Sequence, residues 1–201
     1  IPDSYTYIGP YALCYSNYAS ITLPDTIKEI DVGGCSNTHG TSINIPSGIE
    51  ILRDAAFYAS SFSGEIALPE GLTYMGKNVF SNNDLTSMIF PSTLNHLEDN
   101  CFYNSPGAID CGFNAITKIG FANLDFTDED LGDFVSSFLY CTFCDVIGTA
   151  GDPYDVEIVL PDDLSEANAL ESAFRASLLN LEESDSSFPD LELDFGWSGN
   201  A

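Results

Sequence analysis

Apolar residues followed directly by proline recur along the first half of the chain at a nearly constant spacing. The first such step is Ile1-Pro2, and the next four follow after 22, 22, 23 and 22 residues. These are Leu23-Pro24, Ile45-Pro46, Leu68-Pro69 and Phe90-Pro91. A fixed period of this length is typical of a solenoid in which each repeat forms one coil. The pattern therefore predicts a repeat protein.

The positions inside each repeat predict the path of one coil. Counted from each apolar-Pro step, the fifth and eighth positions are apolar in all five copies. The twelfth holds a small residue and the thirteenth usually a large one, as in Ala56-Phe57 and Val79-Phe80, with Gly34-Cys35 as the weakest copy. We expect this pair to point into the core. Each coil should contain a strand, a turn at proline, a second short extended piece, a turn over the inward pair and a polar loop.

An isoleucine or methionine stands two residues before each later apolar-Pro step, as in Ile21-x-Leu23 and Met88-x-Phe90. This alternation is typical of a strand. It predicts parallel strands at residues 20–23, 42–45, 65–68 and 87–90.

The repeated pattern apolar-Pro-x-x-apolar-x-x-apolar-Gly-x-x-Ala-Phe resembles the BspA-like, treponemal-type leucine-rich repeat family, over residues 1 to about 120. The resemblance implies an α/β repeat solenoid, a leucine-rich-repeat stack of short parallel strands. It also implies a secreted or cell-surface binding protein, commonly an adhesin, without catalysis. The ninth position departs from the pattern, because Gly9 and Gly76 keep the glycine whereas Asp31, Arg53 and Glu98 replace it. We expect the coils without this glycine to turn differently.

Strand alternation also predicts which side chains face outward from the strands before proline. These residues are mostly small, and they are Ser20, Thr22, Ser42, Asn44, Glu65, Ala67, Ser87, Ile89 and Asp110. Solenoids use such open strand faces as binding surfaces, since a parallel sheet otherwise needs a cover. For any single position, the alternative that a small residue merely suits a crowded sheet remains open.

Beyond Pro106 the repeat becomes irregular. We read Ile109-x-Cys111 as the next strand and Ile119-Gly120 as the eighth and ninth positions of a sixth coil. The expected organisation is therefore regular repeats over 1–120 and irregular C-terminal repeats over 121–201, in the same solenoid. A separately packed cap is the alternative for 121–201.

Two helices are expected as insertions in the C-terminal part. The first follows Thr127, with carboxylates at its start and an apolar face within residues 131–139. The second lies within 165–181, and its apolar face consists of Leu170, Ala173, Phe174 and Leu178. Between them the segment 156–161 restores a strand and an apolar-Pro step, and Leu191-x-Leu193-x-Phe195 is a last strand.

The charge of the chain makes some classes of partner unfavourable. The sequence has 31 Asp and Glu against 5 Lys and Arg, a formal charge of −26. Such a surface repels phosphate and anionic lipid, so nucleic acid and membrane surfaces are poor partners. No apolar run approaches the ~20 residues of a membrane helix, so no membrane insertion is expected. No cofactor is expected, and calcium near Asp152 and Asp155 is an open alternative without EF-hand spacing.

Six cysteines permit disulfides in an extracellular protein without proving them. Cys14 and Cys35 occupy the fourteenth and thirteenth positions of adjacent coils, close enough in a stack for a bridge. Cys101 stands at an inward twelfth position and is expected in the core. For Cys141 and Cys144 we favour a structural disulfide or buried thiols over a redox pair or half of a zinc site.

The sequence contains no phosphate-binding glycine loop, nucleophile elbow or metal-binding histidine pair, so we predict no enzyme and no catalytic residue. Two functions remain. The first is an extracellular or cell-surface protein-binding or adhesion module whose ligand is a protein or a host or matrix surface. The second is a structural subunit of an extracellular assembly or filament, formed by head-to-tail stacking. The first repeat lacks an upstream strand residue, so we expect upstream sequence or another copy to cover its end, with Leu191 to Phe195 as the matching surface for self-association.

Overall fold

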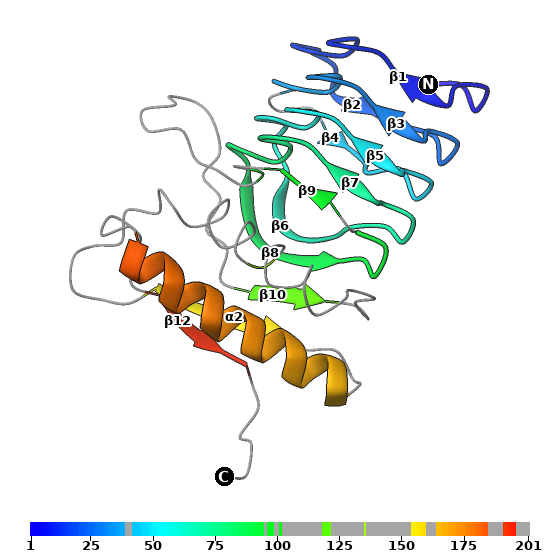
Figure 1. Cartoon of the computed structure of the whole chain (residues 1–201). Coiled ribbons are helices and arrows are strands. Elements are labelled where there is room, and N and C mark those ends of the chain that lie inside the picture. Colours follow the sequence, from blue (N-terminus) through cyan, green and yellow to red (C-terminus); the bar gives the residue numbers. More distant parts are fainter. Residues whose placement is uncertain are drawn as a thin grey trace.

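The structure is a computed structural model that describes residues 1–38, 42–94, 96–98, 101, 118–121, 135, 154–159, 164–184 and 191–195. Its successive coils wind into a solenoid of parallel strands, coloured blue to green in Figure 1. We number the coils by their apolar-Pro steps, so that coil 1 begins at Ile1, coil 2 at Leu23, coil 3 at Ile45, coil 4 at Leu68 and coil 5 at Phe90.

One side of the solenoid is a sheet made from the residues that follow each proline. Its strands are β1 (Tyr7–Ile8), β3 (Glu29–Ile30), β5 (Ile51–Leu52), β7 (Tyr74–Met75) and β9 (His96–Leu97). They pair in parallel in that order, and Ile8 lies opposite Ile30 one repeat later (Figure 1). We call this the post-proline sheet.

The strands before proline form the other side. The two-stranded part consists of β2 (Ser20–Ile21) and β4 (Ser42–Ile43). The five-stranded part has the order β12-β11-β10-β8-β6, and its strands are β6 (Ser63–Ala67), β8 (Asp84–Phe90), β10 (Lys118–Phe121), β11 (Tyr154–Val159) and β12 (Leu191–Asp194). All these pairs are parallel, which confirms the predicted parallel strands in the first four coils.

The turns over the inward pair stack through alternating backbone hydrogen bonds. The Leu13 N–H donates to the Gly34 carbonyl at 2.8 Å, in the next coil, whereas the Cys14 N–H donates back to Tyr11 in its own coil at 3.2 Å. This alternation recurs in later coils. The residues at the eleventh and fifteenth positions have positive φ, the left-handed backbone conformation. The residues concerned are Tyr11, Gly33, Ala55 and Asn78, and Tyr15, Asn37, Ala59 and Asn82.

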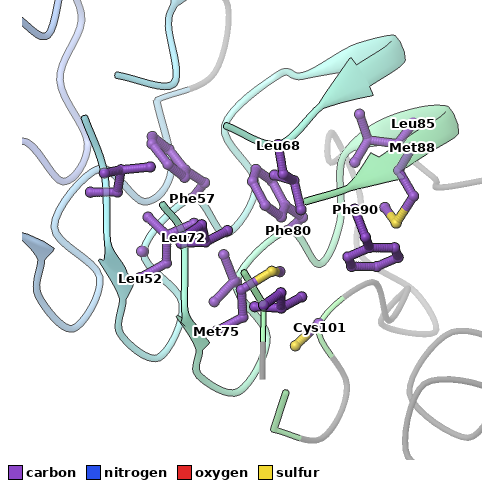
Figure 2. Packing of buried hydrophobic residues seen from close by; sticks show 14 of the residues in the cluster. Leu52, Phe57, Leu68, Leu72, Met75, Phe80, Leu85, Met88, Phe90 and Cys101 are labelled. Carbon is purple, nitrogen blue, oxygen red and sulfur yellow. The ribbon is translucent and has the colours of Figure 1, made fainter. Parts of the chain in front are cut away.

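The core follows the predicted inward positions. Phe57 and Phe80 are fully buried (Figure 2), and their rings stack with centroids 5.6 Å apart. The ring of Phe62 meets both edge-on. The fifth and eighth positions of coils 2 to 4 are also buried, as are Val79 and Cys101. Coil 1 differs, because Ala12 is exposed and Leu13 is only half-buried.

Glycine at the ninth position is not required for the hydrogen bond that joins this position to the preceding coil. Asp31, Arg53 and Glu98 each donate their backbone N–H to the eighth-position carbonyl of the preceding coil, at 2.9 Å. Gly76 makes the same bond to Leu52 at 2.8 Å. The backbone at Gly76 nevertheless lies closer to coil 3, because a Cβ there would come within 2.6 Å of the Asp54 backbone nitrogen and 2.9 Å of the Arg53 carbonyl carbon. The coil with this glycine therefore differs locally from the coils without it.

The placement of the sixth coil is corrected by the register of β10. Ile119 lies opposite Met88 and Phe121 opposite Phe90, so this segment is a strand before the turn and not the eighth and ninth positions. From Phe90 to Phe121 the coil spans 31 residues (121 − 90). The place beside β8 that we expected for Ile109 to Cys111 belongs to β10; residues 109–111 themselves lie outside the described part.

The C-terminal segments continue the same sheet, because β10, β11 and β12 follow β8 in one strand order. The second expected helix is present as α2 (Leu164–Ser184), with Leu170 and Phe174 buried and Ala173 and Leu178 half-buried. The Phe174 and Phe195 rings meet edge-on, 6.1 Å apart, so α2 packs against the end of the last strand. The first expected helix lies outside the described residues except for Val135, which is helical and buried.

Candidate binding surface

The structure places most of the predicted outward residues on the exposed side of the strands before proline. Ser20, Thr22, Ser42, Glu65 and Ala67 are exposed. Ile89 is 38% exposed, whereas Ser87 is only 7% exposed and Asn44 is half-buried. Asp110 lies outside the described residues. We call the eight described residues the strand face.

Strand register brings these residues together in pairs. Ser20 lies opposite Ser42, Glu65 opposite Ser87 and Ala67 opposite Ile89. The Ser87 hydroxyl donates to the Glu65 carboxylate at 3.4 Å. The strand face therefore has small exposed side chains over coils 1 and 2 and an apolar pair, Ala67 and Ile89, over β6 and β8.

Asn44, a residue of the strand face, forms hydrogen bonds with the backbone of Leu23. Its Oδ1 accepts the Leu23 N–H at 2.7 Å, and its Nδ2 donates to the Leu23 carbonyl at 2.8 Å. The Asn44 side chain thus makes the two hydrogen bonds to Leu23 that backbone groups make in a regular strand pair. Substitution of Asn44 would leave the Leu23 backbone groups without these bonds, so this residue is unsuitable for testing recognition.

Three residues of this surface were missed by the sequence analysis. Ser63, Asp84 and Thr86 are exposed on β6 and β8, upstream of the predicted strand starts. The register shifts between Gly64 and Glu65. β6 alternates over its full length, whereas β8 does not, because Ser87 and Met88 are both buried. Nothing in the alternation before proline could have indicated this bulge.

A second set of side chains forms a continuous row across the post-proline sheet, and it was also missed. The Tyr7 hydroxyl donates to Asp31 Oδ2, and Arg53 Nε lies 2.8 Å from Glu29 Oε1. The Arg53 guanidinium lies 5.5 Å from the centroid of the Tyr74 ring. Each of these contacts joins residues of neighbouring coils.

The row ends at His96 on β9. Its ring stacks on Tyr74 with centroids 4.7 Å apart, and its Nε2 lies 2.9 Å from Glu98 Oε1. The seventh and ninth positions, which flank the inward eighth, could have indicated this row, since alternation turns them outward. The row leaves aromatic and charged groups at the surface of the post-proline sheet.

Hydrogen bonds lower the pKa of several carboxyl groups on the solenoid. The Tyr7 hydroxyl, followed by the Val32 N–H, lowers the pKa of Asp31. The Ser47 N–H lowers that of Asp25, and the bond from His96 lowers that of Glu98. In each case the donor stabilises the ionised form, so these groups stay negative at neutral pH.

Most of the Lys and Arg side chains that the structure describes form ion pairs with carboxylates. Lys28, Arg53 and Arg175 each lie 2.8 Å from a carboxylate oxygen, of Glu50, Glu29 and Glu171 respectively. With 31 carboxylates against 5 Lys and Arg, the surface favours positively charged partners.

The cysteines do not form the bridge that the sequence permitted between Cys14 and Cys35. Both are free thiols, as is Cys101. In the stack Cys14 faces Ser36, whose hydroxyl donates to Cys14 Sγ at 3.0 Å, while Cys35 is fully buried in the core. Burial raises the pKa of the Cys35 thiol to about 12. Cys141 and Cys144 lie outside the described residues.

Neither a metal group nor a membrane helix is found in the described residues. They contain no cluster of three or more His, Cys, Asp and Glu that could hold a metal ion. Of the calcium candidates, Asp152 lies outside them and only the backbone of Asp155 is described. None of the described helices is both long and apolar enough to cross a membrane.

Comparison with known proteins gives one finding. Neither the curated proteins nor the solved structures yielded a match. The family model described as a BspA type leucine rich repeat region matches residues 1–108 with six copies, more than half of the 201 residues. Its range covers the five apolar-Pro steps and the coils whose strands and inward pairs are described above. The chain therefore belongs to the BspA-type leucine-rich repeat family.

Proposed function

We propose that the chain is a non-catalytic extracellular or cell-surface module that binds a protein or matrix ligand through the strand face. Members of the family are generally surface proteins that bind other proteins, and a leucine-rich repeat solenoid is typically an interaction scaffold. The observation that carries the proposal is the exposure of Ser20, Ser42, Glu65 and Ala67 along the strands before proline.

Parallel sheets are normally covered on both faces. Here one face packs on the core and the other presents small side chains that allow close approach of a partner's backbone. Ile89 beside Ala67 supplies an apolar centre, and Glu65 and Asp84 supply negative charge around it. An apolar centre with a charged rim is the usual composition of a protein-binding surface.

Binding to immobilised fibronectin, laminin and collagen tests this proposal. Ser42→Arg and Ala67→Arg should abolish binding to whichever of these probes binds the parent chain, because a long charged side chain prevents close approach. Ser172→Arg and Ala176→Arg are matched controls, since both residues are exposed on α2. Strand-face variants that keep the parent's melting temperature and still bind would refute the proposal. Adding calcium to the same assay tests whether this acidic chain uses the ion.

A second proposal is head-to-tail assembly of copies of the chain. β2 and β12 each end the strand order on the side before proline. The end of β12 is thus a candidate to stack on coil 1 of another copy.

Light scattering over a concentration series tests the assembly. Particles that grow with concentration, and that Tyr5→Asp suppresses, would support head-to-tail stacking. Growth should increase with salt, since two chains of charge −26 repel each other. A mass that stays that of one chain at every concentration and salt level would exclude it.

A further inference from the structure

The strand face changes its chemistry along the stack. In coils 1 and 2 its residues carry hydroxyl or amide groups, and they are Ser20, Thr22, Ser42 and Asn44. At the same places before proline, coils 3 and 4 have Glu65, Ala67, Ser87 and Ile89. The strands are also longer here, since β6 has 5 residues and β8 has 7, whereas β2 and β4 have 2 each (Figure 1). We call Glu65, Ala67 and Ile89 the acidic-apolar surface.

Ile89 is the apolar centre of this surface. Beyond coil 1, the exposed large hydrophobic residues of the described part are Ile89 and Leu179. Ala67 on β6 and Gly120 on β10 lie opposite Ile89 on its two sides. The Ile89 side chain lies across Gly120, because a Cβ on that glycine would come within 3.2 Å of Ile89 Cγ1. Neither neighbour has a side chain larger than a methyl group, so the exposed part of Ile89 is accessible to a partner.

Glu65 places a negative charge beside this apolar centre. It is exposed and stands two residues before Ala67 on β6, so the two side chains lie on the same side of the strand, about 7 Å apart. The Ser87 hydroxyl donates to its carboxylate at 3.4 Å. A hydroxyl is a neutral donor, so this bond does not neutralise the carboxylate.

The acidic-apolar surface differs in this respect from the post-proline sheet. There Glu29 and Glu50 each lie 2.8 Å from a cation, of Arg53 and Lys28 respectively. Beside Ile89, the fitting partner group for Glu65 is a Lys or Arg of another molecule. The net charge of −26 favours such a partner over an acidic one.

The spacing of the surface indicates the form of the partner. Glu65 and Ala67 are separated by the distance between residues i and i+2 of any extended chain. An extended segment therefore reaches both with two side chains that point to the same side. The apolar one removes the exposed part of Ile89 from water, which favours binding.

We propose that the acidic-apolar surface docks an extended segment of a partner protein in which an apolar residue and a Lys or Arg stand two positions apart. The apolar side chain packs on Ile89 and Ala67, and the cation pairs with Glu65. This inference rests on the proposed function, since it names the chemistry of the ligand at the strand face. A second copy of the chain is a poorer occupant, because both copies carry a charge of −26.

Fluorescence anisotropy with four labelled peptides tests the proposal. In the first peptide every second residue is serine, and leucine and lysine alternate at the other positions. The second has serine for leucine, and the third has glutamate for lysine. The fourth has the composition of the first, but each leucine is adjacent to a lysine, so that the two point to opposite sides of an extended chain. The parent should bind the first peptide about fivefold more tightly than the second or the fourth, and the third most weakly.

Substitutions at Ile89 and Glu65 separate the two contacts. Ile89→Thr should weaken binding of the first peptide about fivefold and leave the second unchanged, because only the first presents leucine. Ile89→Val keeps an apolar side chain and should bind like the parent. Glu65→Gln should weaken the first and second peptides alike, by about threefold at low ionic strength, and added salt should remove this difference.

Leu179→Thr and Glu50→Gln are the matched controls. Leu179 is exposed on α2, and Glu50 is exposed on the post-proline side of the solenoid. Both variants should bind all four peptides as the parent does. A melting temperature equal to that of the parent shows that a variant is folded. If Ile89→Thr melts lower, Glu65→Gln and the serine-for-leucine peptide still test the two contacts.

Three results would overturn the proposal. The parent could bind the four peptides equally or bind none of them. Ile89→Thr and Glu65→Gln could both keep the preferences of the parent. The third result is a parent chain that self-associates and loses this association in Ile89→Thr, which would make the surface a contact between copies.

These results differ from a failure of the proposed function. Ser42→Arg and Ala67→Arg variants that still bind the matrix protein would exclude the strand face as a binding surface altogether. Loss of matrix binding in those variants, together with unchanged peptide preferences in Ile89→Thr and Glu65→Gln, would refute only the apolar and cationic chemistry of the ligand.

Discussion

Asn83 shows how one buried polar residue joins two coils. Its Oδ1 accepts the N–H groups of Ser60 and Phe62 in the preceding coil, both at 3.0 Å. Its Nδ2 donates to the carbonyls of Phe57 and Phe80, at 3.0 and 2.8 Å. The side chain is fully buried, and each of these backbone groups depends on it because water cannot reach them.

We predict that Asn83→Ala lowers the free energy of unfolding by at least ~2 kcal/mol, because an unsatisfied buried donor costs about 1–3 kcal/mol. Urea denaturation measures the loss. Asn17→Ala is the control, since Asn17 is exposed, and it should change stability by less than ~0.5 kcal/mol. Equal effects of the two substitutions would mean that the bonds of Asn83 do not hold the coils together.

For Tyr15 we predict the opposite effect, a substitution that stabilises the folded protein. Tyr15→Asn should raise the free energy of unfolding by up to ~1 kcal/mol, because asparagine adopts the left-handed conformation at lower cost. For a chain of this size the melting temperature should rise by about 2–4 °C. The reverse change at the equivalent residue of coil 2, Asn37→Tyr, should lower it. A lower melting temperature for Tyr15→Asn would show that the ring contributes packing that outweighs the strain.

The residues also show what the sequence could and could not predict. Inward positions such as Phe80 were predictable, because apolar spacing reports burial directly. The left-handed backbone of Tyr15 was not, since a hydrophobic pattern carries no information about φ. The pairing of Cys14 with Ser36 instead of Cys35 required the exact register between coils, where a difference of one position decides whether two side chains meet.

At the scale of elements, strands are predictable where the repeat length is constant. The parallel pairs of the first four coils follow from the spacing of 22 to 23 residues. β10 was misplaced because its coil spans 31 residues, and a pattern read at the regular spacing assigns Ile119 to the wrong position. The strand face was predicted in outline, while the row across the post-proline sheet was missed because only the alternation before proline was followed.

Junctions between coils are also where stability should depend on pH. Asp25 accepts the Ser47 N–H of the next coil at 2.9 Å, and this bond lowers the pKa of its carboxyl group. A lowered folded-state pKa adds stability above the unfolded value, about 3.9 for aspartate, and that stability is lost as the pH falls through the folded value.

We therefore predict that Asp25→Asn lowers stability at neutral pH, and that the difference from the parent begins to shrink near pH 4 and vanishes only below the lowered pKa of Asp25. Denaturant titrations of both chains at several pH values measure this difference. Repulsion among the remaining carboxylates changes the stability of both chains in the same way, so it largely cancels in the comparison. A difference that stays constant from neutral to acid pH would show that the charge of Asp25 does not contribute.

At the scale of the whole molecule, the repeat separates structural and binding tasks by position. Inward positions build one continuous core along the stack, and outward positions are left to differ between coils. As a result one coil can carry tyrosines and the next serines without a change of fold. The net charge of −26 attracts cationic partners over a long range, and the choice among them depends on these local side chains.

The central claim is that the strand face is open in the free protein and covered by the bound ligand. Thiol labelling of Ala67→Cys, with and without the immobilised matrix protein that binds the parent, measures both. Cys35 and Cys101 are buried, but Cys14 is only half-buried, so the labelling rate of the parent chain with its six native cysteines is measured first and subtracted. We expect Ala67→Cys to react as fast as Ala176→Cys on α2 in the free protein, and to be slowed by the ligand when Ala176→Cys is not. Slow labelling of Ala67→Cys in the free protein, or a rate that the bound ligand leaves unchanged, would contradict the account.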